Sequence, residues 1–177
     1  MNLNIIQLGN PILRNKAKSV SHVHDSKIQQ LIDNLLVKVI KVNGVGLSAP
    51  QVGKPWRIFI LASHPNPRYP QAPQMKPTAM INPKILSASG KKVKGWEGCL
   101  SVPGIRGLVP RYPQMQVEYI NRNGKQVLIE YNDFLARIFQ HEYDHLEGIL
   151  FIDRVTNTKE FISEKEYQNL LKKETVS

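Results

Sequence analysis

Residues 141–149 read His141-Glu142-Tyr143-Asp144-His145-Leu146-Glu147-Gly148-Ile149, and this stretch decides how the fold is interpreted. In an α-helix, residues four positions apart lie on the same face, so His141 and His145 can bind one cation together. Glu142 lies beside that face, where it cannot easily be a third ligand but can reach a water molecule on the metal, as a general base must. A surface helix can also carry this HExxH pattern by chance, so the rest of the chain must decide.

A third metal ligand is needed, because a catalytic tetrahedral site takes three protein ligands and leaves one position to water. Cys99 is the candidate. It is the single cysteine of the sequence, which excludes an intramolecular disulfide and any structural zinc site with two or more thiolates. Free cysteine is also a common core residue, which is the alternative interpretation. The neighbouring glycines and Pro103, within residues 95–104, favour a shaped ligand loop.

A further segment, residues 44–53, contains three glycines and the amide side chain of Gln51. One interpretation is a flexible turn after a helix. A phosphate-binding loop is disfavoured, because the lysine and hydroxyl residue that complete such a loop are missing. The remaining hypothesis is that Gln51 donates a hydrogen bond to an oxyanion.

These three segments resemble, in this order, the signature motifs GxGLxAxQ, EGCLS and QHExDHLxG of the peptide deformylase family. The matching stretches are Gly44 to Gln51, Glu97 to Ser101 and Gln140 to Gly148. The resemblance extends over most of the chain, from residues 9–14 to residues 151–153. Two positions depart from the family pattern: Ser48 stands where alanine is frequent, and Asp133 stands where many members have glycine.

The resemblance implies a metal-dependent hydrolase that removes the formyl group from the N-terminal formyl-methionine of newly made polypeptides and releases formate. It implies that Cys99, His141 and His145 hold one divalent metal ion. The resemblance favours Fe²⁺ in the cell, although a thiolate with two imidazoles also suits Zn²⁺, Ni²⁺ or Co²⁺. Nascent formyl-methionyl polypeptides are the expected partners.

The resemblance also implies roles for residues around the metal. Glu142 is expected to transfer the proton, while the Gln51 amide and the Leu100 backbone N–H bind the oxyanion. The expected substrate-binding residues are Val45, Gly46, Gly98, Phe134, Ile138 and His141. Backbone groups of the first three would align the peptide as an added strand. An apolar pocket of Phe134, Ile138, the His141 ring and Val45 would take the methionine, with core packing as the competing explanation.

Two acidic residues, Glu97 and Asp144, can be interpreted in two ways. Each can accept a hydrogen bond from a metal-ligating histidine and thereby orient the ring. Each can instead form an ion pair with Arg106, Arg111 or Arg137. The sequence leaves both alternatives open.

Composition limits the class of protein. The chain has 177 residues, 41% of them hydrophobic, which is enough for one domain with a core. The formal net charge is +10, which predicts attraction to anionic partners such as RNA. The basic residues are scattered and match no nucleic-acid module, so sequence-specific nucleic-acid binding is not expected.

The expected location is the bacterial cytoplasm, in preference to an organellar matrix or stroma. No apolar run approaches the roughly 18 residues that mark a membrane span, so no membrane partner is expected. The opening Met1-Asn2-Leu3-Asn4 does not read as a signal peptide. A lone thiol fits a reducing compartment.

The fold class predicted is α+β, with antiparallel β-sheets packed around a central metal-binding helix. Apolar residues at helical spacing predict an amphipathic helix over residues 27–41, capped by Asp25 or Ser26. The metal helix is expected to start at Asn132 or Asp133 and to end at Gly148. The predicted strands are Trp56 to Leu61, Ala79 to Leu86, Met115 to Ile120 and Gln126 to Tyr131, the last two joined by an Asn-Gly turn.

Residues 1–155 are predicted to form a single catalytic domain, followed by a partly helical C-terminal tail over residues 156–177. The family resemblance makes this tail a candidate contact with the ribosome near the exit tunnel. Residues 63–77 carry five of the twelve prolines, which predicts an exposed irregular loop. This loop is either a lid at the substrate groove or a solvated insertion.

Two other functions compete with deformylation. A zinc peptidase of the HExxH type usually completes its site with a downstream glutamate or histidine, whereas Cys99 lies upstream. A non-catalytic basic ribosome-binding protein would account for the charge of +10, but it would not need Glu142, Gln51 and Cys99 together.

Overall fold

The computed structural model of the protein describes residues 3–174. In this part of the chain the α-helices are α1 (Ser26–Lys41), α2 (Asp133–Leu146) and α3 (Glu164–Glu174). The strands are β1 (Gly46–Ser48), β2 (Ile58–Leu61), β3 (Thr78–Ser89), β4 (Val93–Cys99), β5 (Val102–Arg111), β6 (Gln114–Ile120), β7 (Gln126–Asn132) and β8 (Phe161–Ser163). Short 3-10 helices lie at Pro11–Arg14, Ala49–Val52, Phe151–Arg154 and Thr158–Glu160.

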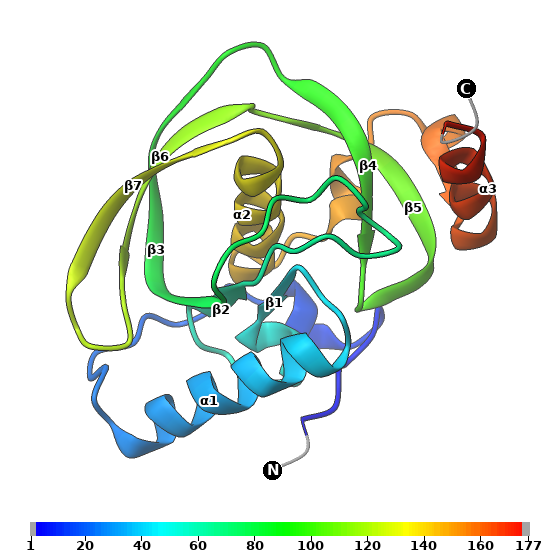
Figure 1. Ribbon diagram of the computed structural model, residues 1–177. Coiled ribbons are helices and arrows are strands. Elements are labelled where there is room, and N and C mark those ends of the chain that lie inside the picture. Colours follow the sequence, from blue (N-terminus) through cyan, green and yellow to red (C-terminus); the bar gives the residue numbers. More distant parts are fainter. Residues whose placement is uncertain (1–2, 175–177) are drawn as a thin grey trace.

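The strands form two antiparallel sheets around helix α2. One sheet has the order β1-β2-β3-β6-β7, and the other has the order β4-β5-β8. Figure 1 shows α2 enclosed between β3, β6 and β7 on one side and β4 and β5 on the other, with α1 across the lower end of the molecule. The predicted α+β fold, with antiparallel sheets around the metal helix, is therefore confirmed.

Helix α1 confirms the prediction for residues 27–41 to within one residue. It begins where the Asp25 side chain accepts a hydrogen bond from the Lys27 backbone N–H at 2.7 Å. Its buried face contains Ile28, Leu31, Ile32, Leu35 and Val39. Full burial of one such side chain contributes roughly 1.5–3 kcal/mol. The helix thus anchors the segment that follows, in which the Gly44 N–H donates to the Val39 carbonyl at 2.8 Å.

Helix α2 is buried because its apolar face packs into the core between the sheets. Phe139 is fully buried and meets the Phe59 ring edge-on, with centroids 5.2 Å apart. Asn132 occupies the N-cap position but makes no side-chain capping hydrogen bond. Asp133 adopts the left-handed conformation, with φ +47°, which explains why glycine suits this position. Gly148 follows the helix in the same conformation, where a Cβ would lie only 2.5 Å from the Arg14 carbonyl oxygen.

The second signature segment differs from the prediction. Residues 95–104 are not a loop but the turn end of a β-hairpin, formed by β4 and β5 with a tight turn at residues 100–101. Cys99 pairs with Val102 at the end of the hairpin, after a register shift between Glu97 and Cys99. The glycines and Pro103 hid the alternating strand pattern. The three-residue strands β1 and β8 were also not predicted, because they are too short to carry a periodic signal.

The proline-rich residues 63–77 form the connection between β2 and β3 and contain no helix or strand, as predicted. They are not a fully exposed loop, however. Asn66 and Ala72 are buried, and the Ser63 hydroxyl donates to the Pro73 carbonyl oxygen at 2.6 Å. These internal contacts fold the segment back on the body of the protein.

The C-terminal tail contributes to the smaller sheet before it forms a helix. Strand β8 pairs with β5, with Ile105 opposite Ser163 and Gly107 opposite Phe161. Helix α3 follows directly and packs outside β5, as Figure 1 shows in red and orange. The last residues of the predicted tail, 175–177, lie outside the described residues. The division between domain and tail at residue 155 stays a prediction.

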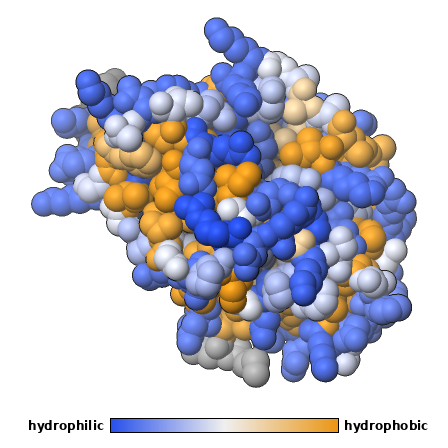
Figure 2. Space-filling view, turned by 180° about the vertical axis from the view of Figure 1, so that it is seen from behind, coloured by the Kyte–Doolittle hydropathy of each residue, from blue (hydrophilic) through white to orange (hydrophobic). Residues whose placement is uncertain are grey.

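The surface carries no continuous apolar belt on the face drawn in Figure 2, where orange hydrophobic patches alternate with blue hydrophilic side chains. The larger exposed apolar side chains include Val37, Ile40 and Leu128. Among residues 3–174, none of the helices has both the length and the apolar character required to traverse a lipid bilayer.

Candidate metal centre

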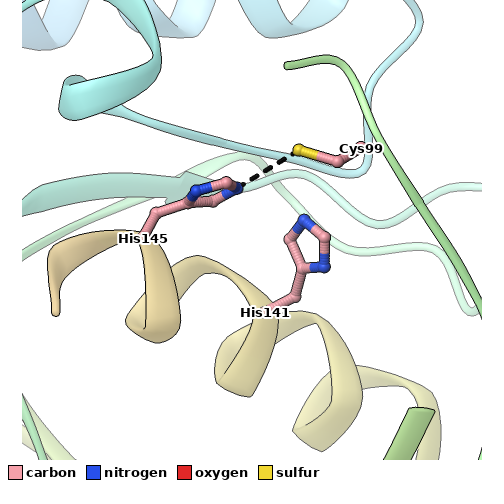
Figure 3. Close-up of side chains that lie close together, drawn as sticks. All are labelled: Cys99, His141 and His145. Carbon is pink, nitrogen blue, oxygen red and sulfur yellow. Dashed lines mark hydrogen bonds between the residues drawn. The ribbon is translucent and has the colours of Figure 1, made fainter. Parts of the chain in front are cut away.

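Three predicted metal ligands meet at one point. The donor atoms of Cys99, His141 and His145 all lie within 4.8 Å of one another, and the Cys99 Sγ lies 3.3 Å from His145 Nε2. Figure 3 shows the two imidazoles rising from neighbouring turns of α2 towards the sulfur. A tetrahedral zinc-type ion separates its sulfur and nitrogen ligands by about 3.4–3.8 Å. The donors need to move little to reach that spacing, so this group can hold a single metal ion.

The surroundings of the two histidines shift their pKa values in opposite directions. Burial lowers the pKa of His145 well below its ordinary value, and the charges of His141 and Arg111 lower it further. This imidazole is therefore neutral, which is the state that binds a metal. Burial also opposes protonation of His141, but hydrogen bonds to Cys99 and Glu97 outweigh it and raise the pKa of His141 well above the ordinary value. A positive charge is thus stabilised beside Cys99.

Glu97 performs both of the roles that the sequence left open. Its carboxylate accepts a hydrogen bond from His141 Nδ1 at 2.9 Å, which turns Nε2 of this ring towards the metal position. The same carboxylate accepts hydrogen bonds from Arg111 Nε at 2.9 Å and from Arg137 Nη1 at 3.0 Å. Burial raises the pKa of Glu97, but the charge of Arg111 outweighs it and holds that pKa below the usual range. Glu97 therefore remains a carboxylate that orients His141.

Asp144 forms ion pairs, and within residues 3–174 its hydrogen bonds go to arginines rather than to an imidazole. It accepts hydrogen bonds from Arg111 Nη1 at 2.6 Å and from Arg154 Nη2 at 2.7 Å. Arg106, the third arginine considered, pairs instead with Glu164. The Nδ1 atom of His145 is buried without a hydrogen-bond partner among the described residues.

Glu142 is buried next to the three metal-binding candidates, with 3% of its surface exposed. A Cβ at Gly46 would lie 2.4 Å from Glu142 Oε1, so the glycine leaves room for this carboxylate. Burial raises the pKa of Glu142 to about 7; the charge of His141 lowers this pKa by a smaller amount, and the charge of Glu97 raises it further. A group with that pKa can accept and release a proton near neutral pH. Its Oε2 atom is buried without a partner among the described residues, which leaves it free for a reacting group.

Gln51 is held in one orientation by Ser48. Gln51 Oε1 accepts hydrogen bonds from the Ser48 backbone N–H at 2.9 Å and from its hydroxyl at 3.0 Å. The Gln51 Nε2 donor therefore faces Cys99 Sγ, at 3.4 Å. From the sequence, Ser48 is only a departure from the alanine that is frequent at this position. The spacing Ser48-x-x-Gln51, typical of a capping box, was the signal that could have revealed its role.

A surface hollow joins nearly all the predicted site residues. It is lined by Val45, Gly46, Gln51, Gly98, Cys99, Leu100, Phe134, Ile138, His141 and Glu142. The hollow also includes Arg68, Tyr69 and Arg137, which were not predicted as site residues. Arg68 and Tyr69 belong to the proline-rich segment and carry no local pattern that indicates function.

Comparison with known proteins agrees with this arrangement. The family model for polypeptide deformylase matches residues 2–161. Peptide deformylase 2 from Nostoc sp. is 61% identical over 173 residues, which cover 98% of this chain and 97% of the relative. The crystal structure of a class I type b peptide deformylase from Acinetobacter baumannii with Met-Ala-Ser bound is 43% identical, with a TM-score of 0.85, over 88% of this chain and 99% of that chain.

A second solved structure gives the same result. The peptide deformylase from Synechococcus elongatus in complex with actinonin is 37% identical, with a TM-score of 0.80, over 89% of this chain and 81% of that chain. The similarity thus covers both the metal centre and the sheets that carry it. The chain belongs to the polypeptide deformylase family.

Proposed function

We propose that this protein removes the formyl group from the N-terminal formyl-methionine of newly made polypeptides and releases formate. The observation that carries the proposal is the position of Glu142, a buried carboxylate with a free oxygen beside three donors that fit one metal ion. Cys99, His141 and His145 would hold this ion. When bound, a divalent metal supplies a nucleophilic oxygen at neutral pH and polarises the formyl carbonyl. Fe²⁺ is the ion we propose in the cell, although the same donors accept Zn²⁺, Ni²⁺ or Co²⁺.

The residues of the chain then divide the remaining work. The Glu142 carboxylate accepts the proton of the attacking water and delivers it to the departing amine nitrogen, which cannot leave without it. Gln51 Nε2 and the Leu100 backbone N–H donate hydrogen bonds to the oxyanion that develops on the formyl oxygen. Removal of one such donor typically lowers kcat by about 10²–10³-fold. The hydrogen bonds from Ser48 support this role, because they fix which end of the Gln51 amide faces the site.

The sheet topology supports binding of the substrate as an added strand. Strand β1, which begins at Gly46, and strand β4, which contains Gly98, are each the outermost strand of their sheet. Their free backbone groups can therefore pair with an extended peptide. Backbone groups of Val45, Gly46 and Gly98 would align the peptide, while Phe134, Ile138 and the His141 ring, with Val45, would take the methionine side chain.

Formate release from formyl-Met-Ala-Ser by the metal-loaded protein tests the proposal. The parent protein should release formate and one new amine per turnover, and it should not cleave unformylated Met-Ala-Ser. Glu142→Gln should lower kcat by at least about 10²-fold while metal content, measured by elemental analysis, stays unchanged. Cleavage of unformylated peptides would instead support a zinc peptidase. Full metal occupancy without any turnover would support a binding protein.

The location and the ribosomal partner are separate proposals. We place the protein in the bacterial cytoplasm and propose that α3 contacts the ribosome, because its last turn carries Lys172 and Lys173. Cosedimentation with ribosomes should weaken steeply as salt rises, as expected for contacts with RNA phosphates. A Lys172→Glu and Lys173→Glu double variant that cosediments like the parent would contradict this contact. Membrane binding and sequence-specific nucleic-acid binding are not expected.

A further inference from the structure

Tyr69, in the proline-rich segment, lies in the hollow but has no role in the proposed reaction. Figure 1 shows this segment extending from β2 across α2 towards β4 and β5. The ring of Tyr69 packs against the ring of Phe134 on α2, with centroids 5.1 Å apart. The Arg106 guanidinium lies 5.0 Å from the centre of the same tyrosine ring. Tyr69 is therefore in contact both with the candidate methionine pocket and with strand β5.

Residues of helix α3 contact the groups that adjoin Tyr69. Arg106 is 1% exposed, and its Nε and Nη2 atoms donate to the Glu164 carboxylate at 2.7 and 3.1 Å. Its guanidinium lies 4.0 Å from the centre of the Tyr167 ring, a cation–π distance. The Tyr167 hydroxyl donates to the backbone carbonyl of Arg68 at 3.1 Å. Helix α3 thus contacts both the cation beside Tyr69 and the backbone that precedes it.

The segment holds its own backbone in a turn, whereas the ring of Tyr69 is held by contacts with other parts of the chain. Within the segment, the Tyr69 N–H donates to the Asn66 carbonyl at 2.9 Å, and the Tyr69 carbonyl accepts from the N–H groups of Asn66 and Ala72, both at 3.2 Å. A further anchor is made by the Arg68 side chain, whose Nη2 atom donates to the Asn43 carbonyl oxygen at 2.6 Å. The segment is therefore tied to residues just before the first signature motif and to α3. Both hydrogen bonds are made by Arg68, the residue directly before Tyr69.

We propose that Tyr69 is a specificity-determining residue, one wall of the pocket for the first side chain of the formyl-peptide, and that α3 positions it through Glu164, Tyr167 and Arg106. This inference rests on the proposed deformylase function. The aromatic pair of Tyr69 and Phe134 suits a methionine side chain, because a thioether packs well against ring edges. Removing the Tyr69 ring should widen the pocket and favour bulkier first residues.

The test compares kcat and KM for formyl-Met-Ala-Ser and formyl-Phe-Ala-Ser. Tyr69→Ala should lower the preference for methionine, as the ratio of the two kcat/KM values, by about tenfold, the lower end of what a missing methylene does in an apolar pocket. Tyr69→Phe keeps the ring and should stay near the parent ratio. Gln71→Ala, an exposed change in the same segment, is the matched control.

The positioning role of α3 is tested with Tyr167→Leu, which removes the ring over Arg106 and the hydroxyl bond to Arg68. It should shift the ratio in the same direction as Tyr69→Ala, and by less. It should raise KM for the methionine peptide with little change in kcat, whereas partial unfolding would lower kcat alone. Leu170→Ala, at a half-exposed position of α3, should leave both constants unchanged.

The outcomes separate this inference from the function on which it rests. Thermal unfolding curves establish that each variant is folded, and Tyr69→Leu replaces Tyr69→Ala if the latter is not. A parent that deformylates, combined with an unchanged peptide preference in the folded Tyr69 variants, overturns the specificity role alone. An unchanged preference in Tyr167→Leu overturns the positioning by α3. A parent that turns over no formyl-peptide overturns the proposed function and this inference together.

Discussion

Gly46→Ala should disable the proposed general base without touching any metal ligand. A Cβ at residue 46 would lie 2.4 Å from Glu142 Oε1 and 2.8 Å from its carboxyl carbon, whereas an ordinary contact is at least 3.4 Å. Glu142 is buried and cannot turn into solvent, so its carboxylate must shift by about 1 Å. A displacement of that size at a reacting group can lower the rate by about 10²-fold. We therefore expect kcat for formyl-Met-Ala-Ser to fall by about that factor, with metal content unchanged.

Two comparisons show whether the loss acts through Glu142. Gly44→Ala is the matched control, because a Cβ there would make its closest contact at 3.3 Å, with Val39, and should cost little activity. In a Glu142→Gln background, Gly46→Ala should change kcat by less than about threefold, because the two changes disable the same group. A Gly46→Ala variant with nearly parental kcat would refute the reasoning. A further loss of about 10²-fold in kcat when Gly46→Ala is added to Glu142→Gln would also refute it.

Three further predictions concern stability and the metal. Asp133→Ala should lower the free energy of unfolding by about 1 kcal/mol, because φ is +47° there, whereas Asp133→Gly should not; urea denaturation measures both. The pKa of Glu147 is lowered because Arg57 and Lys16 outweigh the effect of burial. Its carboxylate therefore stabilises the fold above the ordinary pKa of 4.5, and this contribution is lost as the pH falls through the lower folded pKa. Glu147→Gln should thus cost about 1 kcal/mol at pH 7 and progressively less as the pH falls below 4.5; a cost that does not fall with pH would contradict the ion pair. The iron-loaded enzyme should lose activity in air while nickel- and zinc-loaded forms keep it, and equal loss in all three would refute iron-dependent oxidation of the site.

The parts of the structure that the sequence predicted are those specified by local spacing. Helix α1 follows from apolar residues at intervals of three and four, and the β6–β7 hairpin follows from Asn123-Gly124 between two strand-like runs. The relation of His141, Glu142 and His145 is fixed by one helical turn. Such features need no knowledge of the rest of the chain. The segment around Cys99 was less accessible, because glycines and Pro103 concealed two paired strands.

The parts that were not predicted depend on pairing between distant residues. Glu97 and Arg111 lie on the neighbouring strands β4 and β5, and Asp144 reaches the same guanidinium from α2. Sequence analysis identified these acidic and basic residues but could not decide which pairs form, since that depends on how the hairpin packs against α2. Arg111 binds both oxygens of Glu97, and His141 shares one of these oxygens with it.

The reaction and its substrate preference are therefore specified by different kinds of information in this chain. The proposed general base, Glu142, and two of the metal-binding candidates lie in one turn of α2, so any sequence that forms this helix brings them together. The wall at Tyr69 instead depends on a loop of irregular structure, a buried arginine on β5 and a helix about one hundred residues further along the chain. Motif similarity can identify the chemistry because its geometry is local. Preference for the first residue can change through α3 or the proline-rich segment while every catalytic motif stays intact, so it must be measured for each member of the family.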